Sequence, residues 1–256
     1  MGAAERVLGA LVELAPGGFE QVDGQGFVEY ALYGAPGELP ALPAGEAEIA
    51  GVRVWVSATE VATDWADRWK RFHKPVVIGE RLRVRPPWSE PRPGTLDLVI
   101  DPGRAFGTGA HPTTRLCLEL LLELEPHGSL LDLGCGSGVL AIAGAKLGFD
   151  PVHAVDNELA ALDATRANAR ANGVELDRLE RLNLREHLPP PAGVVVANLT
   201  RPLLLRVAAM MTARPDSLIV SGLLDTETEE VAAAFDLLRE RRRLYSKGWC
   251  ALRLDG

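Results

Sequence analysis

The hydrophobic positions in the first sixty residues change from helical to alternating spacing. Apolar side chains first recur three and four residues apart, which predicts a helix that ends at a Pro-Gly-Gly sequence; the positions are Val7, Leu8, Leu11, Val12 and Leu14. Residues 27–34 and 51–58 then alternate between apolar and polar side chains, as strands do, and a connection rich in Pro and Gly separates them. We therefore predict a small α+β domain over residues 1–60.

Residues 61–94 are predicted to link this domain to the rest of the chain. A short helix is expected before Pro75, because proline ends a helix. Residues 76–88 have the alternation of a hairpin that ends at two consecutive prolines. The pattern leaves open which of its two neighbours this hairpin packs against.

From residue 95 the pattern becomes a regular alternation of strands and helices. Strands are predicted for residues 95–100, 129–133, 151–155, 179–184, 193–199 and 216–223, and helices for residues 111–125, 138–148, 158–173, 201–211 and 225–243. Apolar strands joined by helices indicate an α/β fold with a mostly parallel, doubly wound sheet. Ligands of such sheets bind outside the carboxyl ends of the strands. We predict this domain for residues 95–256.

Composition and charge narrow the class of protein. Apolar residues make up 47% of the chain, and the net charge of −8 does not fit a general nucleic-acid binder. The sequence contains neither an apolar run long enough to span a membrane nor a signal peptide. The three cysteines are widely spaced, and neither they nor the histidines have metal-ligand spacing. We expect a cytoplasmic monomer that binds no membrane, no metal and no nucleic acid directly.

A glycine-rich turn follows the strand predicted at residues 129–133. Gly134 and Gly136 belong to a Gly-x-Gly-x-Gly pattern, in which missing Cβ atoms let the backbone approach a ligand closely. The next strand ends in Asp156, 22 residues after Gly134, where a carboxylate can accept hydrogen bonds from ribose hydroxyls. These features predict an adenosine-type cofactor. An ordinary strand-to-helix turn with a capping acid is the structural alternative.

The spacing of the glycines favours S-adenosylmethionine over a dinucleotide. A dinucleotide site would have Gly-x-Gly-x-x-Gly, and the third position here is Val139. Residues 130–200 resemble the core of a class I methyltransferase, a Rossmann-like fold. This resemblance implies that Asp132 lies near the methionine moiety and that Asn183 contacts the adenine. A turn residue is the alternative interpretation of Asn183.

Asn198 ends the fourth strand of this core and is the candidate catalytic residue. Class I enzymes that methylate nitrogen often have Asn or Asp followed by Pro-Pro and an aromatic residue there, whereas this chain continues with Leu199 and Thr200. A lysine amine has a pKa near 10.4 and an α-amine near 8, so the site must favour the neutral amine and aim its lone pair. An amide oxygen can accept an N–H bond without adding charge, and much of the rate would then come from positioning. A structural role at the strand end is the alternative.

A second glycine-rich stretch, "DPGRAFGTGAHPTT", occupies residues 101–114. Its glycines allow a loop that closes over a ligand and excludes water, and Phe106 could cover a sulfonium or an adenine. Thr113 and Thr114 begin a predicted helix, where hydroxyl and N–H groups suit a carboxylate. A rigid connection plugged by Phe106 is the alternative. For His111, a capping or packing role is favoured over that of a proton acceptor.

The same stretch closely resembles the signature of the PrmA family, ribosomal-protein methyltransferases that modify the large-subunit protein L-eleven. Residues 64–88, 194–199 and 248–254 resemble that family's linker, fourth-strand motif and closing strand. The resemblance implies repeated methylation of lysine side chains and of the N-terminal amine. It also implies cofactor contacts from one set of residues: Phe106, Gly107, Thr108, Thr114, Gly134, Asp156 and Asn198.

The sequence constrains the identity of the protein substrate less than it constrains the type of reaction. The family's N-terminal domain docks the ribosomal protein and opens with a β-strand, whereas this chain starts directly with the predicted helix. A related enzyme that methylates lysines of the electron-transfer flavoprotein β subunit is therefore an alternative. An NAD-dependent oxidoreductase could use the same Asp156, and an inactive cofactor-binding module is a further alternative.

Overall fold

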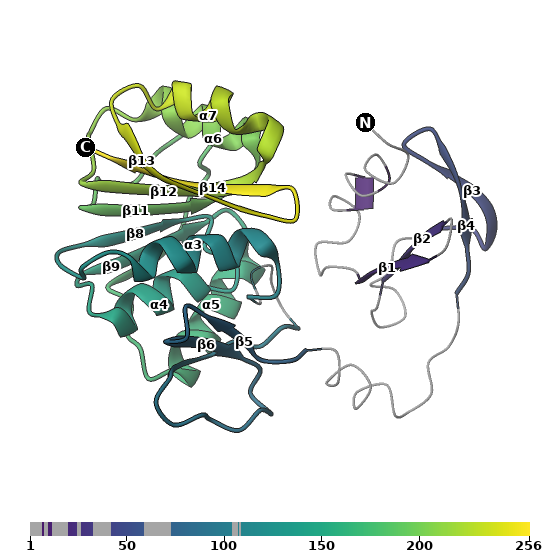
Figure 1. Cartoon of the computed structure of the whole chain (residues 1–256), viewed down its shortest axis with the longest axis horizontal. Helices are drawn as coiled ribbons and strands as arrows, with labels where there is room; N and C mark the ends of the chain where they lie inside the picture. Colours follow the sequence, from purple (N-terminus) through teal and green to yellow (C-terminus); the bar gives the residue numbers. More distant parts are fainter. Residues whose placement is uncertain are drawn as a thin grey trace. The chain divides into compact units, whose positions relative to one another are not determined.

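The structure is a computed structural model that describes residues 7, 10–11, 20–24, 27–32, 42–58, 73–103, 107 and 109–256. The chain divides into two compact units, residues 1–69 and 70–256 (Figure 1). The ranges 1–60, 61–94 and 95–256 stay predictions, and the compact units differ from them in one respect. Residues 70–94 belong with the second unit instead of forming a separate linker. The short helix predicted before Pro75 falls mostly outside the described residues.

The first unit contains two antiparallel hairpins. They are β1 (Glu20–Gly24) with β2 (Phe27–Ala31), and β3 (Gly45–Ile49) with β4 (Val52–Val56). The predicted strands at 27–34 and 51–58 are confirmed in β2 and β4. Val7, Leu11 and Ile49 are buried together, so the described part of the predicted helix packs on the hairpins. Strand β3 was not predicted, because its glutamates alternate with small side chains and Ile49 is its one large apolar residue.

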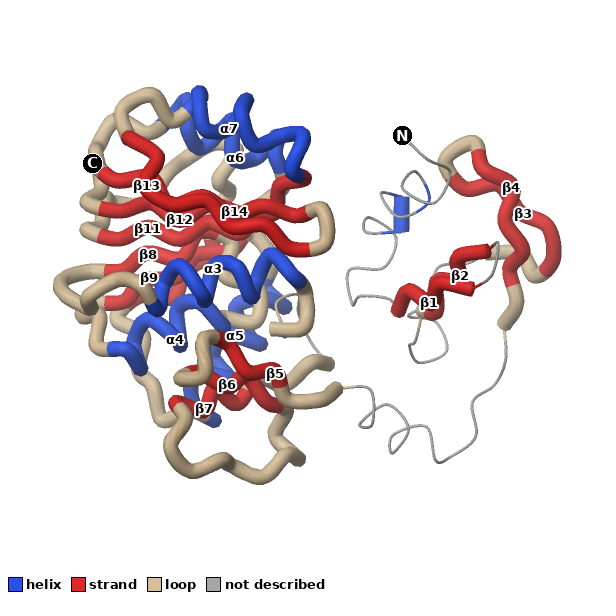
Figure 2. The backbone as a smooth tube through the Cα atoms, viewed as in Figure 1, coloured by secondary structure: helices blue, strands red, loops and turns tan. Residues whose placement is uncertain are grey.

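A seven-stranded sheet forms the centre of the second unit (Figure 2). Its order is β10-β9-β8-β11-β12-β14-β13. The first five strands are parallel, and β14 pairs antiparallel with both β12 and β13. The strands are β8 (Leu130–Leu133), β9 (Val152–Asp156), β10 (Arg178–Arg181), β11 (Val194–Asn198), β12 (Ser217–Leu224), β13 (Arg239–Ser246) and β14 (Trp249–Asp255). The predicted doubly wound, mostly parallel sheet is therefore confirmed.

Helices cover both faces of this sheet (Figure 1). They are α3 (Pro112–Leu122), α4 (Val139–Leu147), α5 (Leu159–Ala171), α6 (Arg201–Met210) and α7 (Thr228–Ala234), and a short 3-10 helix, η1 (Asp225–Glu227), leads into α7. Alternate strand residues point to opposite faces. Leu130 and Val196 therefore pack with α3, α4 and α5, whereas Leu131 and Val195 pack with α6 and α7.

A small sheet lies outside the main one. The predicted hairpin is confirmed as β5 (Val76–Ile78) and β6 (Leu82–Arg85), and β7 (Leu96–Val99) pairs parallel with β6. Strand β7 is therefore separate from the doubly wound sheet that its place in the sequence suggested. Its apolar residues share one core with α3 and α4, and Lys146 of α4 donates a hydrogen bond to the carbonyl of Asp97 at 2.8 Å.

The helix predicted over residues 225–243 is wrong in its second half. Helix α7 ends at Ala234, and residues 239–246 form the edge strand β13, which pairs antiparallel with β14. Arginine, glutamate and leucine favour helix locally, but pairing with a neighbouring strand outweighs that preference. The charges also protect the exposed edge from pairing with another chain. Within the described residues, no helix is long and apolar enough to cross a membrane.

Candidate active site

Three parallel strands bring the predicted site residues to one edge of the main sheet. Gly134 follows β8, while Asp156 and Asn198 end β9 and β11, the two neighbours of β8. The chain order reverses at β8, since β9 and β10 extend to one side and β11 and β12 to the other. Such a reversal is where doubly wound sheets bind their ligands.

The turn after β8 is held by backbone hydrogen bonds to β9. The N–H groups of Gly134 and Cys135 both donate to the carbonyl of Val155, at 2.9 and 3.0 Å. Gly134 has a φ of +76°, and a Cβ there would overlap the side chain of Leu199. The positive φ favours glycine here, an added Cβ would displace the end of the Leu199 side chain, and the turn presents backbone in place of side chains.

Asp156 is oriented by two backbone N–H groups. Its Oδ2 accepts from Gly136 at 3.0 Å, and its Oδ1 accepts from Glu158, the N-cap of α5, at 3.0 Å. A carboxylate oxygen has two lone pairs, so each oxygen retains one for a ligand. Asp156 is half-buried. The two hydrogen bonds fix the direction of its carboxylate, and each oxygen can still accept a further hydrogen bond from a ligand.

Asp132 lies inside β8 and is 1% exposed. Its Oδ2 accepts from the N–H of Ala141 in α4 at 3.0 Å, while Oδ1 has no hydrogen-bond partner in the described part of the chain. The pKa of this carboxyl is raised to about 7, mainly by burial, against the hydrogen bond from Ala141 and with a smaller contribution from the charge of Asp156. A buried oxygen without a partner is costly, which indicates a place where a ligand donor fits.

The two glycine-rich segments are joined to each other. The hydroxyl of Ser137 donates to the carbonyl of Gly107 at 2.8 Å, and a Cβ on Gly107 would lie 2.9 Å from that hydroxyl oxygen. Gly107 has a φ of +103° and is buried. The predicted roles of Phe106 and Thr108 fall outside the described residues.

His111 caps α3. Its Nδ1 lies 2.8 Å from Oγ1 of Thr113 and accepts from the N–H of Thr113 at 3.4 Å. The ring packs edge-on against Trp249, with 4.9 Å between centroids. Burial lowers the pKa of His111 to about 4, so the ring is neutral at pH 7. The favoured interpretation, capping and packing, is therefore confirmed.

Asn198 reaches α3 across the sheet edge. Its Nδ2 donates a hydrogen bond to Oγ1 of Thr114, which is fully buried, at 3.4 Å. Behind it, Gly222 forms a bulge in β12 with a φ of +87°, and a Cβ there would overlap the carbonyl of Leu199. Gly222 thus allows the chain after Asn198 to pass close to β12, a role that the sequence pattern did not predict.

Asn183 lies beyond the end of β10, two residues past Arg181. Its Oδ1 accepts from the N–H of Arg185 at 3.1 Å, and its Nδ2 donates to Glu186 at 2.8 Å. The side chain therefore closes a local turn, in agreement with the alternative interpretation. A contact with adenine stays a prediction.

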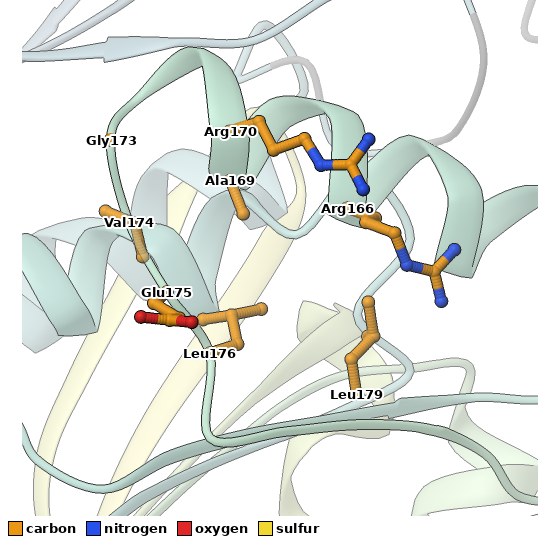
Figure 3. A pocket seen from close by; sticks show the side chains of 8 residues that line it. All are labelled: Arg166, Ala169, Arg170, Gly173, Val174, Glu175, Leu176 and Leu179. Carbon is orange, nitrogen blue, oxygen red and sulfur yellow. The ribbon is translucent and has the colours of Figure 1, made fainter.

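A hollow of about 440 Å³ lies along the C-terminal half of α5 (Figure 3). It is lined by Arg166, Ala169, Arg170, Gly173, Val174, Glu175, Leu176 and Leu179. The segment 173–176 leads into β10, so this hollow lies toward the amino ends of the strands. None of the described site residues lines it, and Gly134, Asp156 and Asn198 lie at the opposite, carboxyl ends of the strands.

The strand order and the site edge define the class I methyltransferase fold. A solved structure described as ribosomal protein L11 methylase, from Lactobacillus delbrueckii subsp. bulgaricus, has this fold, with a TM-score of 0.64 and 24% identity over 72% of this chain and 98% of that one. The family model "Ribosomal protein L11 methyltransferase (PrmA)" matches residues 45–255. The chain therefore belongs to the PrmA family.

Curated relatives named ribosomal protein L11 methyltransferase support this membership. The protein of Vibrio parahaemolyticus is 41% identical over 197 residues, 74% of this chain and 66% of its own length. That of Caldanaerobacter subterraneus subsp. tengcongensis is 36% identical over 72% of this chain and 61% of its own length. The chain thus spans about three fifths to two thirds of the length of these relatives.

Proposed function

We propose that this chain is an S-adenosylmethionine-dependent protein N-methyltransferase that modifies lysine or N-terminal amines of ribosomal protein L11. The main support for this proposal is the hydrogen bond from Ser137 to Gly107, which joins the two glycine-rich segments. Asp156 and Asn198 end the two strands that flank the strand before Ser137. Membership of the PrmA family supports the reaction, and the names of the relatives support the substrate.

The residues at the sheet edge fit this cofactor. The two oriented oxygens of Asp156 would accept the ribose hydroxyls, and the unpartnered Oδ1 of Asp132 would accept an N–H of the methionine amino group. The first turn of α3, which contains Thr113 and Thr114, would face the methionine carboxylate, since helix N-termini favour anions. Gly134 and Gly136 would leave room for the body of the ligand.

Bound S-adenosylmethionine supplies a methyl group activated on a positively charged sulfur. The chain's own contribution is to orient the acceptor amine and to favour its neutral form. With its amide nitrogen turned to Thr114, Asn198 has Oδ1 left to accept an N–H bond and so to aim the nitrogen lone pair. His111 is neutral at pH 7, so it adds no positive charge near an amine that must lose its proton.

The absence of a fixed carboxylate base at Asn198 suits repeated transfer. An amine that has received one methyl group must rotate before it can receive the next, and an amide acceptor tolerates that rotation. We further propose that the enzyme works in the cytoplasm as a monomer without direct nucleic-acid contact. The net charge of −8 and three free, buried cysteines support this setting.

The first test is calorimetric titration of the chain with S-adenosylmethionine and, separately, with NAD. The proposal predicts binding of the first and none of the second. Methyl-labelled cofactor added to a lysate of the source organism should then label a protein, to be identified by mass spectrometry. NAD binding alone, or label found only on RNA or a small molecule, would overturn the proposal.

A further inference from the structure

Helix α5 carries a stripe of polar side chains on its buried face. Thr165 is fully buried, Asn168 is 3% exposed, and Asn172 caps the C-terminal end of the helix on the same side. Asn168 and Asn172 follow Thr165 by three and seven residues, which places all three along one helix face. Burying polar groups costs free energy unless each finds a partner, so their partners show what the stripe is for.

Thr165 holds the glycine turn from behind. Its hydroxyl donates to the carbonyl of Gly136 at 2.9 Å, while the N–H of the same glycine donates to Asp156 at 3.0 Å. Gly136 is thus fixed on both sides, and the direction of the Asp156 carboxylate depends on it. The methyl group of Thr165 also fills the space beside Gly138, where a Cβ would lie 2.7 Å from it.

Asn168 links the same turn to the start of the other glycine segment. Its Nδ2 donates to the carbonyl of Ser137 at 2.8 Å, and its Oδ1 accepts from the N–H of Asp101 at 3.0 Å. The peptide group is planar and trans, so a carbonyl held toward α5 directs the next N–H group away from α5. Thr165 and Asn168 together hold two consecutive carbonyls, those of Gly136 and Ser137.

Asn172 has similar chemistry but different partners. Its side-chain amide accepts from the N–H of Val99 at 2.8 Å and donates to the carbonyl of Val99 at 2.7 Å, as a neighbouring strand would. It therefore fastens β7 to α5, and within the described part of the chain it makes no hydrogen bond with the turn at residues 134–138. It offers a matched control for the other two positions.

We infer that Thr165 and Asn168 are positioning residues that set the geometry of the cofactor site from the buried face of α5. The inference rests on the proposed function and adds residues that touch neither cofactor nor substrate. They act through Gly136, Ser137 and Asp156. Fully satisfied buried networks of this kind fix one geometry, and their effect therefore falls on cofactor affinity more than on methyl transfer.

The test compares Thr165→Val, Thr165→Ser and Asn172→Ala with the unchanged chain. Valine keeps the shape of threonine but removes the hydroxyl, so the dissociation constant and KM for S-adenosylmethionine should rise at least about fivefold with kcat within about twofold. Serine restores the hydroxyl and should recover most of the affinity. Asn172→Ala should lower the melting temperature but leave cofactor affinity within about twofold.

The outcomes separate this inference from the proposed function. If the unchanged chain binds S-adenosylmethionine and Thr165→Val binds it equally well, the inference is overturned and the proposed function stands. If the unchanged chain does not bind it, the proposed function fails and the inference with it. Should Thr165→Val not fold, Asn168→Ala decides by the same affinity criterion. An equal loss in Asn172→Ala would show general destabilisation and overturn the inference.

Discussion

The hydroxyl of Ser137 donates a hydrogen bond to the carbonyl of Gly107 at 2.8 Å, across thirty residues of sequence. This bond joins the glycine turn after β8 to the segment whose sequence resembles the PrmA signature. The same serine is held through its own carbonyl by Asn168 of α5. The two glycine-rich segments are therefore joined by hydrogen bonds, directly through Ser137 and also through Asn168.

Ser137→Ala should weaken binding of S-adenosylmethionine by about threefold to tenfold, the scale of one lost buried hydrogen bond. Isothermal titration measures this directly. Ser129→Ala is the matched control, because its hydroxyl accepts a backbone N–H, from Gly193, at the far edge of the sheet at 3.0 Å. Equal affinity losses in both variants would show that the bond between Ser137 and Gly107 has no specific role.

Asp156→Ala should reduce cofactor affinity by about 1–3 kcal/mol, as expected for lost hydrogen bonds to a charged acceptor. Asp177 directly precedes β10, and its Oδ2 accepts from the N–H of Val152, the first residue of β9, at 2.8 Å. Asp177→Ala removes a similar bond and should cost stability alone. Calorimetric binding that is unchanged in Asp156→Ala would refute the ribose assignment.

Asp132 should make stability and binding respond in opposite directions. The pKa of its carboxyl is raised to about 7 by burial, against an ordinary value of 3.8. Between these values the folded state holds a proton that the unfolded state has lost, so this group lowers the free energy of unfolding as pH rises from about 4 to about 7. Asn in its place removes that dependence.

Urea unfolding of Asp132→Asn and of the unchanged chain at pH 5 and pH 8 tests the sign. The stability of the variant relative to the unchanged chain should rise by about 1–4 kcal/mol between the two pH values. His111 titrates in both proteins and cancels in the difference. Cofactor binding at pH 8 should nevertheless be weaker in the variant. A stability difference that does not change with pH would contradict the account of Asp132.

Gly222→Ala should destabilise the chain by about 3 kcal/mol or more, since its Cβ would meet the backbone of Leu199 at a positive φ. The displaced segment follows Asn198 directly, so methyl transfer should fall further than the stability loss explains at a temperature where the variant is folded. Gly173→Ala is the control, because its φ is also positive but no atom lies within 4 Å of the added Cβ. Similar losses in both variants would rule out the packing role of Gly222.

The sequence predicted most of the second unit, because apolar strands alternating with capped helices have few other ways to pack. The meeting of the glycine turn, Asp156 and Asn198 at one end of the sheet could be predicted because each occupies a strand end. Strand β13 could not, since its arginines and glutamates favour helix and only pairing with β14 makes it a strand. The polar stripe of α5 was not predicted for a related reason. Thr165 and Asn168 are polar, which in sequence suggests an exposed position, and only their hydrogen bonds to the turn at Gly136 and Ser137 account for their burial.

The central claim is methyl transfer to amines of ribosomal protein L11, and purified L11 tests it most directly. The chain, S-adenosylmethionine and L11 should give mass increments of whole methyl groups on L11, located by fragmentation to lysines or the N-terminal amine. At a cofactor concentration that saturates it, Asn198→Ala should lose about a hundredfold or more in the single-turnover rate. L11 of unchanged mass, under conditions in which the chain binds S-adenosylmethionine, would contradict the account.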